Sequence, residues 1–429
     1  MTFFHGIFSH KYKLLSLVFL GIMVHYIYPV YDSYAHRDKV PLPPFGWTAV
    51  PSEAPVTEKL IDPQYRVAAS NVLHAMETRR MKIGAPSYSA AVAIKGKLVW
   101  AGALGWANID NNIKATPDTI YRVGSTSKAI TATALARLVD ASIIDLDMPI
   151  STYMKDLPNE TWSNITSRQL ASHMAGLSHY AQKGVKRDLK GLYGVIAMQK
   201  HYDNVTEALE IFDGTSLRSA PGSEFYYSSQ GTVLLGAVMS AAAEKPYLQI
   251  IKEEVLQPNQ MHATIIAPVK SNGENNIATS YKRRGANIAD RQVRPWRAVD
   301  LSSRLPGGGF ASTPSDLVKV GLAYFDESKI KAETRDAFWT PQKLLNGETN
   351  PQNYAIGWRF QGWPVEGLGK VENANHGGVS RGAQSLLMVI PEHEMVIAFN
   401  ANIKTDNYPE FGRLYKDIIR EFVTVLPAK

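Results

Sequence analysis

The sequence predicts an α/β protein whose sheet is built from both ends of the chain, with a second lobe of helices inserted between the two halves. Residues 88–104 and 384–400 each have the pattern of a β-hairpin, whereas residues 125–299 show helical patterns and loops with few strand runs. Because a sheet must bury an apolar face, we expect a central antiparallel sheet flanked by helices, formed by residues 59–124 and 300–429.

The N-terminal part of this sheet is expected to follow a helix. Residues 62–82 are amphipathic and precede Gly84, a residue type that ends helices. Residues 88–94 and 97–104 are then predicted as two strands, with the turn at Lys95 and Gly96.

The C-terminal part repeats this composition. Residues 384–390 and 395–400 are predicted strands joined across residues 391–394, and a helical pattern runs from about residue 410 to 423. The similarity of the two chain ends is the reason for placing both in one sheet.

Composition excludes several classes of function. The 429 residues, 45% hydrophobic and 20% charged, suffice for one large domain or two closely packed ones. The 46 basic and 39 acidic residues are spread without a dense cluster, so we do not expect nucleic-acid binding. The absence of cysteine excludes disulfides, thiolate metal sites and a cysteine nucleophile.

The first 36 residues are predicted to lie outside the fold. Residues 14–30 are uncharged and mostly apolar, Lys11 and Lys13 precede them, and the first acidic residue is Asp32. A membrane anchor and a signal peptide cleaved after Ala35 both fit this pattern, and we favour the anchor. Either way the lysines favour export of the remainder, to a periplasmic or extracellular face, membrane-anchored or secreted if the segment is cleaved.

Residues 37–58 are predicted to be a linker. Five prolines fall between Pro41 and Pro55, which is typical of a semi-extended spacer between a membrane and a globular body. The serine hydrolase domain described next is expected over residues 59–429.

The stretch of residues 121–140 has the pattern of a nucleophile helix. Ser125 stands where the helix would begin, and Lys128 follows three residues later on the same face. A serine hydroxyl needs a base to become nucleophilic, and a lysine buried by the apolar residues that follow can be that base. Ser125 as an ordinary helix cap is the simpler reading. The spacing alone is weak, since residues 328–331 match it in a charged segment.

Two other elements supply candidate partners for Ser125. Tyr227, Ser228 and Ser229 follow a Pro-Gly turn and precede an apolar helical run, so they present hydroxyl groups from a loop. His376 is followed by Gly377 and Gly378 just before the second hairpin, and glycines allow a substrate to approach the backbone.

In this order the three elements resemble the motifs of the penicillin-recognising serine hydrolases. Further stretches match the branch that holds class C beta-lactamases, D-stereospecific peptidases, beta-lactamase-like esterases and mitochondrial serine beta-lactamase-like proteins: residues 121–128, 170–180, 221–229, 306–317 and 354–358. The likeness covers about residues 60–425 and implies a beta-lactamase/transpeptidase-like fold.

The resemblance also implies roles. Ser125 would be acylated, Lys128 and Tyr227 would share the proton transfer, and the backbone N–H groups of Ser125 and Val379 would form an oxyanion hole. Substrate-binding positions would be Ser229, His376, Gly377 and Gly378. The substrate would be a small-molecule or peptide acyl compound; no metal or cofactor is implied.

Two departures from the family pattern bear on the substrate. Ser229 replaces an asparagine found in many relatives, and His376 with its two glycines replaces Lys-Thr-Gly, so the hydroxyl that would hold a beta-lactam carboxylate is absent. We therefore expect an esterase or peptidase rather than an efficient beta-lactamase. His376 is equally suited to orienting its loop or to contacting a ligand.

Two alternatives remain. Residues 378–382 match the Gly-x-Ser-x-Gly nucleophile elbow, with Ser380 as the nucleophile. That motif requires a strand before it, a helix after it, and then an acidic residue followed by a histidine. The residues after Ser380 do not provide these features, so we reject this reading. The alternative from another class is a non-catalytic, membrane-tethered binding or scaffolding protein that keeps the fold.

Overall fold

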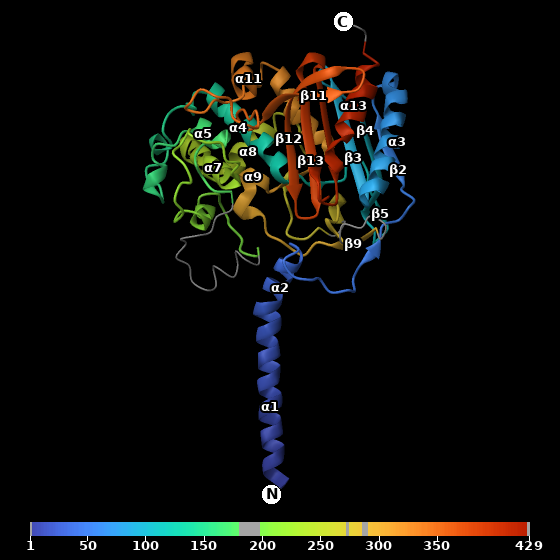
Figure 1. Ribbon diagram of the computed structural model, residues 1–429, viewed down its shortest axis with the longest axis vertical. Coiled ribbons are helices and arrows are strands. Elements are labelled where there is room, and N and C mark those ends of the chain that lie inside the picture. The colour runs from blue at the N-terminus through green and yellow to red at the C-terminus, as the bar shows by residue number, and fades with distance from the viewer. Residues whose placement is uncertain (1, 180–197, 272–273, 285–290, 427–429) are drawn as a thin grey trace.

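The central sheet joins strands from both ends of the chain, as predicted (Figure 1). The computed structural model describes residues 2–179, 198–271, 274–284 and 291–426. Seven strands lie in the order β11-β12-β13-β14-β3-β4-β2, and the short β5 pairs with β4. Their bounds are β2 Val56–Leu60, β3 Ser87–Ile94, β4 Lys97–Asn108, β5 Ile113–Lys114, β11 Arg359–Val365, β12 Gly369–Ser380, β13 Ala383–Ile390 and β14 Met395–Ala401.

The two predicted hairpins meet at the middle of this sheet. Strand β14 pairs antiparallel with β3, with Met395 opposite Ile94 and Ala401 opposite Tyr88. Every residue of β3, β13 and β14 is buried, because alternate side chains enter two different cores on opposite faces. The sheet is therefore an inner layer covered on both sides.

Helices cover each face. One core includes α3 (Arg66–Ile83) and α13 (Leu414–Val423), and the other includes α4 (Ser127–Asp140) and α10 (Pro314–Leu322). Gly84 ends α3 in the left-handed conformation, at φ 64°, as its position predicted. The predicted C-terminal helix is divided: α12 (Tyr408–Gly412) and α13 are separated at Arg413, whose ψ of −7° departs from helical geometry.

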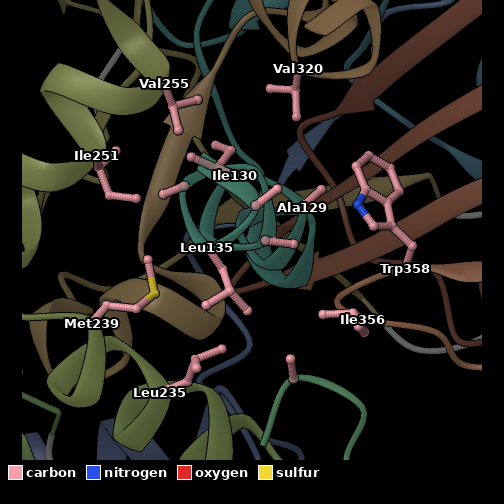
Figure 2. Close-up of a cluster of buried hydrophobic side chains, with 14 of the residues drawn as sticks. Ala129, Ile130, Leu135, Leu235, Met239, Ile251, Val255, Val320, Ile356 and Trp358 are labelled. Carbon is pink, nitrogen blue, oxygen red and sulfur yellow. The ribbon is translucent and has the colours of Figure 1, made fainter. Parts of the chain in front are cut away.

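The second lobe packs around α4, which lies among helices and loops on nearly all sides (Figure 2). Helices α5 (Ser167–Ala171), α7 (Ser229–Ala243) and α8 (Tyr247–Ile251) belong to this lobe, and the later helices α9 (Leu305–Gly308) and α11 (Ala332–Trp339) pack with them. Figure 2 shows Leu235 and Met239 of α7 beside Leu135 of α4, with Trp358 on the opposite side of that helix. This burial fixes the helix that carries Lys128.

Residues 125–299 were expected to be helices and loops with few strands, and short strands do lie within the described part of this range. Two three-stranded sheets, β1-β9-β8 and β6-β10-β7, use strands from this range. Their bounds are β1 Thr48–Ala49, β6 Tyr121–Arg122, β7 Ile265–Ile266, β8 Tyr281–Arg283, β9 Gln292–Pro295 and β10 Phe310–Ser312. The strands escaped prediction because they are two to four residues long, too short to show a period.

The N-terminal segment is a long helix that projects from the body (Figure 1). It consists of α1 (Thr2–Ile22), a π-helical turn at Met23–Ile27 and α2 (Tyr28–Ala35). By length and composition the 24 residues Tyr12–Ala35 are able to cross a membrane, since an 18-residue window within them has a mean hydropathy of 1.8.

The predicted linker is not a free spacer. Asp38 forms an ion pair with Lys282 at 2.7 Å, β1 pairs with β9, and β2 pairs with β4. Edge strands offer unpaired backbone groups, so the extended linker hydrogen-bonds to them. The predicted boundary between residues 58 and 59 would divide β2. The linker and the end of the N-terminal helix are both part of the body.

Candidate active site

Ser125 lies in a tight turn between a strand and the buried helix α4. Strand β6 leads into a 3₁₀ turn at Gly124–Thr126, and α4 begins at Ser127. Ser125 is partly exposed, whereas its neighbours Gly124 and Thr126 are buried. The cap position of α4 is Thr126 and no side chain caps the helix there, which disfavours the reading of Ser125 as a simple cap.

Lys128 is held beside Ser125 by three oxygen atoms. Its Nζ donates to the carbonyl of Gly307 at 2.7 Å, and lies 3.0 Å from Ser229 Oγ and 3.4 Å from Ser125 Oγ. The side chain is only 2% exposed. A carbonyl can only accept, but both hydroxyls can donate, so a neutral amine could receive the proton of Ser125 without moving. The Ser125 distance is long, as is common before substrate binds.

The second motif is brought to the same place. The Tyr227 ring centroid lies 4.9 Å from Lys128 Nζ. Ser228 caps α7: its Oγ accepts from Gly231 N at 2.9 Å and donates to Ser178 O at 2.7 Å. Because these two hydrogen bonds fix Ser228, its neighbours Tyr227 and Ser229 are held close to Lys128.

Two histidines that sequence reasoning did not single out position this loop. The Nδ1 atom of His173 accepts from Ser228 N at 3.3 Å, and Nδ1 of His179 accepts from Ser229 N at 3.1 Å. Both histidines lie in the stretch 170–180 that contributed to the family resemblance, and this resemblance was the signal that could have identified them. Tyr180, at the end of that stretch, lies outside the described residues. An Nδ1 that accepts must be unprotonated.

Burial keeps these rings neutral. Burial, followed by the charges of Lys128 and Arg304, lowers the pKa of His179 to about 4. Burial also lowers the pKa of His173 well below its ordinary value, again with Lys128 contributing. Both rings therefore remain hydrogen-bond acceptors at neutral pH.

His376 lies inside β12, not in a loop before a strand as predicted. It is fully buried, with Nε2 2.8 Å from the Tyr354 hydroxyl and Nδ1 2.8 Å from Gly377 O. Burial, then the charges of Arg359 and Lys128, lowers its pKa well below the ordinary value. With both nitrogens engaged, the ring is placed to fix β12, and this geometry favours the orienting role over ligand contact.

The glycines of the third motif pack closely against neighbouring segments. A Cβ at Gly378 would lie 1.8 Å from Val123 O, and one at Gly377 would lie 2.5 Å from the Tyr408 hydroxyl. A side chain at either position would therefore collide with the protein itself. A Cβ at Gly124 would likewise lie 2.5 Å from Val379 O. These contacts set the end of β12 directly against the turn that carries Ser125.

Ser380 has no elbow geometry. It ends β12, and β13 begins at Ala383 after a short turn, so a strand follows where the elbow motif requires a helix.

Comparison with known proteins identifies the family of this chain. The Beta-lactamase family model matches residues 73–418. The chain is 27% identical over 414 residues to the serine beta-lactamase-like protein LACTB, mitochondrial, of Homo sapiens, across 76% of this chain and 72% of that protein. It is 24% identical over 336 residues to Protein flp of Staphylococcus aureus (strain MW2), across 76% of this chain and 61% of that protein.

Solved structures show the fold. The D-amino acid amidase from Ochrobactrum anthropi SV3 has a TM-score of 0.65 at 21% identity, across 84% of this chain and 99% of that one. The octameric penicillin-binding protein homologue from Pyrococcus abyssi has a TM-score of 0.62 at 22% identity, across 83% and 77%. This chain therefore belongs to the beta-lactamase family and has the beta-lactamase/transpeptidase-like fold.

Proposed function

We propose that the protein is a serine acyl hydrolase that works through an acyl-enzyme on Ser125. The observation that carries this proposal is the position of Lys128 Nζ, 3.4 Å from Ser125 Oγ and held there by Gly307 and Ser229. A buried amine next to a partly exposed hydroxyl is the arrangement that activates a serine without a histidine base.

The reaction would proceed in two steps. Ser125 Oγ forms a bond to the carbonyl carbon of the substrate, the bond from that carbon to the leaving oxygen or nitrogen breaks, and the serine proton passes to the leaving group. Lys128 and Tyr227 would share this transfer, as the family resemblance implies, and the Tyr227 ring centroid lies 4.9 Å from Lys128 Nζ. Water then attacks the acyl-enzyme, and the acid leaves as Ser125 regains its proton.

The developing negative charge would be held by the backbone N–H groups of Ser125 and Val379. The close packing of Gly124 against Val379 supports this assignment, because it leaves no freedom between the two donors. Two such donors fixed in advance are worth about 3 to 4 kcal/mol each in barrier height.

An ester, amide or peptide is the proposed substrate class, with Ser229, His376, Gly377 and Gly378 around the site. The printed name of one structural relative, D-amino acid amidase, is compatible with an amide substrate. His376 is buried and neutral where a beta-lactamase offers a lysine and a hydroxyl, so a beta-lactam carboxylate would lack its usual partners. Beta-lactam hydrolysis is therefore not part of the proposal.

The helix Tyr12–Ala35 is proposed to be a retained membrane anchor, with the body exported. Ser33 and Ala35, which would form the cleavage site of a signal peptide, are 1% exposed and helical. A peptidase would have to detach them from the body first.

A serine-reactive fluorescent phosphonate tests the nucleophile. Wild type should be labelled, Ser125→Ala should not, and Ser380→Ala should be labelled like wild type. Labelling that persists in Ser125→Ala would assign a different nucleophile, and an unlabelled wild type would favour the scaffold alternative. A p-nitrophenyl ester, a D-amino-acid amide and a chromogenic beta-lactam then assign the substrate class.

A further inference from the structure

Arg122 is a buried cation next to the nucleophile turn. It ends β6, three residues before Ser125, and is only 3% exposed. Its guanidinium donates to three backbone carbonyls: from Nη2 to Pro268 O at 2.8 Å and Val269 O at 3.2 Å, and from Nη1 to Arg381 O at 3.5 Å. Its Nε is buried, and no described atom lies within hydrogen-bond distance of it.

The charge of this guanidinium is not neutralised. Burial lowers the pKa of Arg122 to about 10, and no carboxylate of the described residues opposes that shift. The side chain therefore still carries its charge at neutral pH. A charge taken out of water without a counter-ion destabilises a fold, and sequences break such rules mainly at functional sites. Stability alone does not account for an arginine at this position.

One of the three carbonyls lies in the turn that follows the proposed oxyanion donor. Arg381 stands between β12 and β13, two residues beyond Val379, which is about 7 Å of extended chain. The end of β12 already packs against the nucleophile turn at Gly124. The guanidinium of Arg122 adds a second attachment, from the strand that leads into the same turn. The position of the Val379 N–H group relative to Ser125 therefore depends on both contacts.

The other two carbonyls lie on the side of the lysine. Residues 268–269 follow β7, and Ala267 N donates to Gly309 O at 2.8 Å. Gly307, two residues earlier, provides the carbonyl that holds Lys128 Nζ. One guanidinium thus connects the segment behind the proposed base with the segment behind the proposed oxyanion donor. A planar group with several donors in a fixed arrangement suits this use.

From this arrangement we infer that Arg122 is a positioning residue for acyl transfer through Ser125. It fastens the oxyanion donor Val379 to the nucleophile strand, and its uncompensated charge favours the negative charge that develops on the substrate oxygen. At a separation of about 10 Å and an effective dielectric constant of about 20, one unit charge affects another by the equivalent of about 10-fold in rate. The inference rests on the hydrolase function proposed above.

Two substitutions test this role. Arg122→Lys keeps the charge but loses the planar set of donors, whereas Arg122→Gln loses the charge as well as part of that set. With p-nitrophenyl butyrate we expect kcat per folded molecule to fall about 10-fold in Arg122→Lys and about 100-fold in Arg122→Gln. KM should change by less than about three-fold, because the contacts matter in the transition state and not in substrate binding. A loss confined to KM, or an Arg122→Gln kcat no lower than that of Arg122→Lys, overturns the inference.

Arg80 in α3 provides the matched control. It is a fully buried arginine that also donates to backbone carbonyls, those of Pro51 and Ser52, but it is ion-paired with Glu77. Arg80→Gln should lower the free energy of unfolding and leave kcat per folded molecule at the wild-type level. A comparable fall of kcat in Arg80→Gln would mean that Arg122 acts only through general stability, and the inference would be wrong.

Phenylboronic acid gives a second measurement that does not need Arg122→Gln to fold. The Ser125 oxygen donates an electron pair to boron and its proton leaves, so the adduct is a tetrahedral anion that resembles the transition state. In Arg122→Lys the inhibition constant should rise about 10-fold, in parallel with the fall of kcat. An inhibition constant equal to that of wild type contradicts the positioning role.

Ser125→Ala separates this inference from the proposed function. If that variant no longer hydrolyses the ester while both Arg122 variants keep the wild-type kcat, only the positioning role is refuted. If Ser125→Ala hydrolyses the ester as fast as wild type, or wild type does not hydrolyse it, the hydrolase proposal fails and this inference fails with it.

Discussion

Replacing Gly378 by alanine should separate the two parts of the proposed oxyanion hole. The added methyl group would lie 1.8 Å from Val123 O, 2.7 Å from Thr126 Oγ1 and 2.9 Å from Thr126 N. All three atoms belong to the turn that carries Ser125. Since ordinary contacts begin near 3.4 Å, strand β12 and this turn must part by about 1.6 Å (3.4 minus 1.8).

A displacement of that size has a calculable cost. A misplacement of about 1 Å between reacting groups lowers rates about 10²-fold, which corresponds to about 2.7 kcal/mol of barrier height. We therefore expect Gly378→Ala to lower kcat/KM for p-nitrophenyl butyrate about 10²-fold or more. The matched control is Gly231→Ala in α7, where the new Cβ has its nearest neighbour at 3.6 Å and activity should stay at the wild-type level.

The assay compares phosphonate labelling rates and ester turnover for the two variants. Circular dichroism and thermal unfolding give the folded fraction of each variant, to which the rates are normalised. Slower labelling per folded molecule supports the packing of β12 against the nucleophile turn as the origin of the oxyanion site. A Gly378→Ala enzyme that is folded and within about three-fold of wild type would refute that reasoning.

Three further outcomes are expected. Lys128→Arg should abolish phosphonate labelling because arginine does not release its proton, and near-normal labelling would remove this residue from proton transfer. Ser229→Ala should slow labelling about 10-fold by removing one of the groups that hold the lysine, whereas Ser229→Thr should recover part of the rate. The free energy of unfolding should fall as pH drops from about 6.5 toward 4, because the unfolded chain takes up protons that native His179 excludes. Urea titrations should show a shallower fall for His179→Asn, and an unchanged slope would contradict the neutral ring.

The sequence was most informative where a single residue type has one geometric use. Gly84 ended a helix and Lys95 with Gly96 formed a hairpin turn, as both patterns indicated. The proximity of Ser125 and Lys128 followed from helical spacing alone. These features depend on neighbours along the chain, which a sequence pattern records.

Contacts between distant segments were not accessible in this way. Nothing near His173 or His179 indicates that their rings accept hydrogen bonds from residues 228 and 229. The close packing of Gly377 against Tyr408 and of Gly378 against Val123 joins segments that are far apart in the sequence, so no local pattern indicates it. The pairing of the linker strands β1 and β2 with β9 and β4 was not predicted, because only the folded sheets bring these distant segments together.

The pairing of β3 with β14 has a consequence for biosynthesis. Strand β3 ends at Ile94, but its partner begins at Met395, about 300 residues later (395 minus 94 is 301). During translation, the edge of β3 that pairs with β14 stays uncovered until nearly the entire polypeptide has left the ribosome. This delay favours slow folding and a need for chaperones. A premature stop codon at position 395, which removes only the last 35 residues, would leave this edge bare and should yield an aggregated product rather than a shortened enzyme.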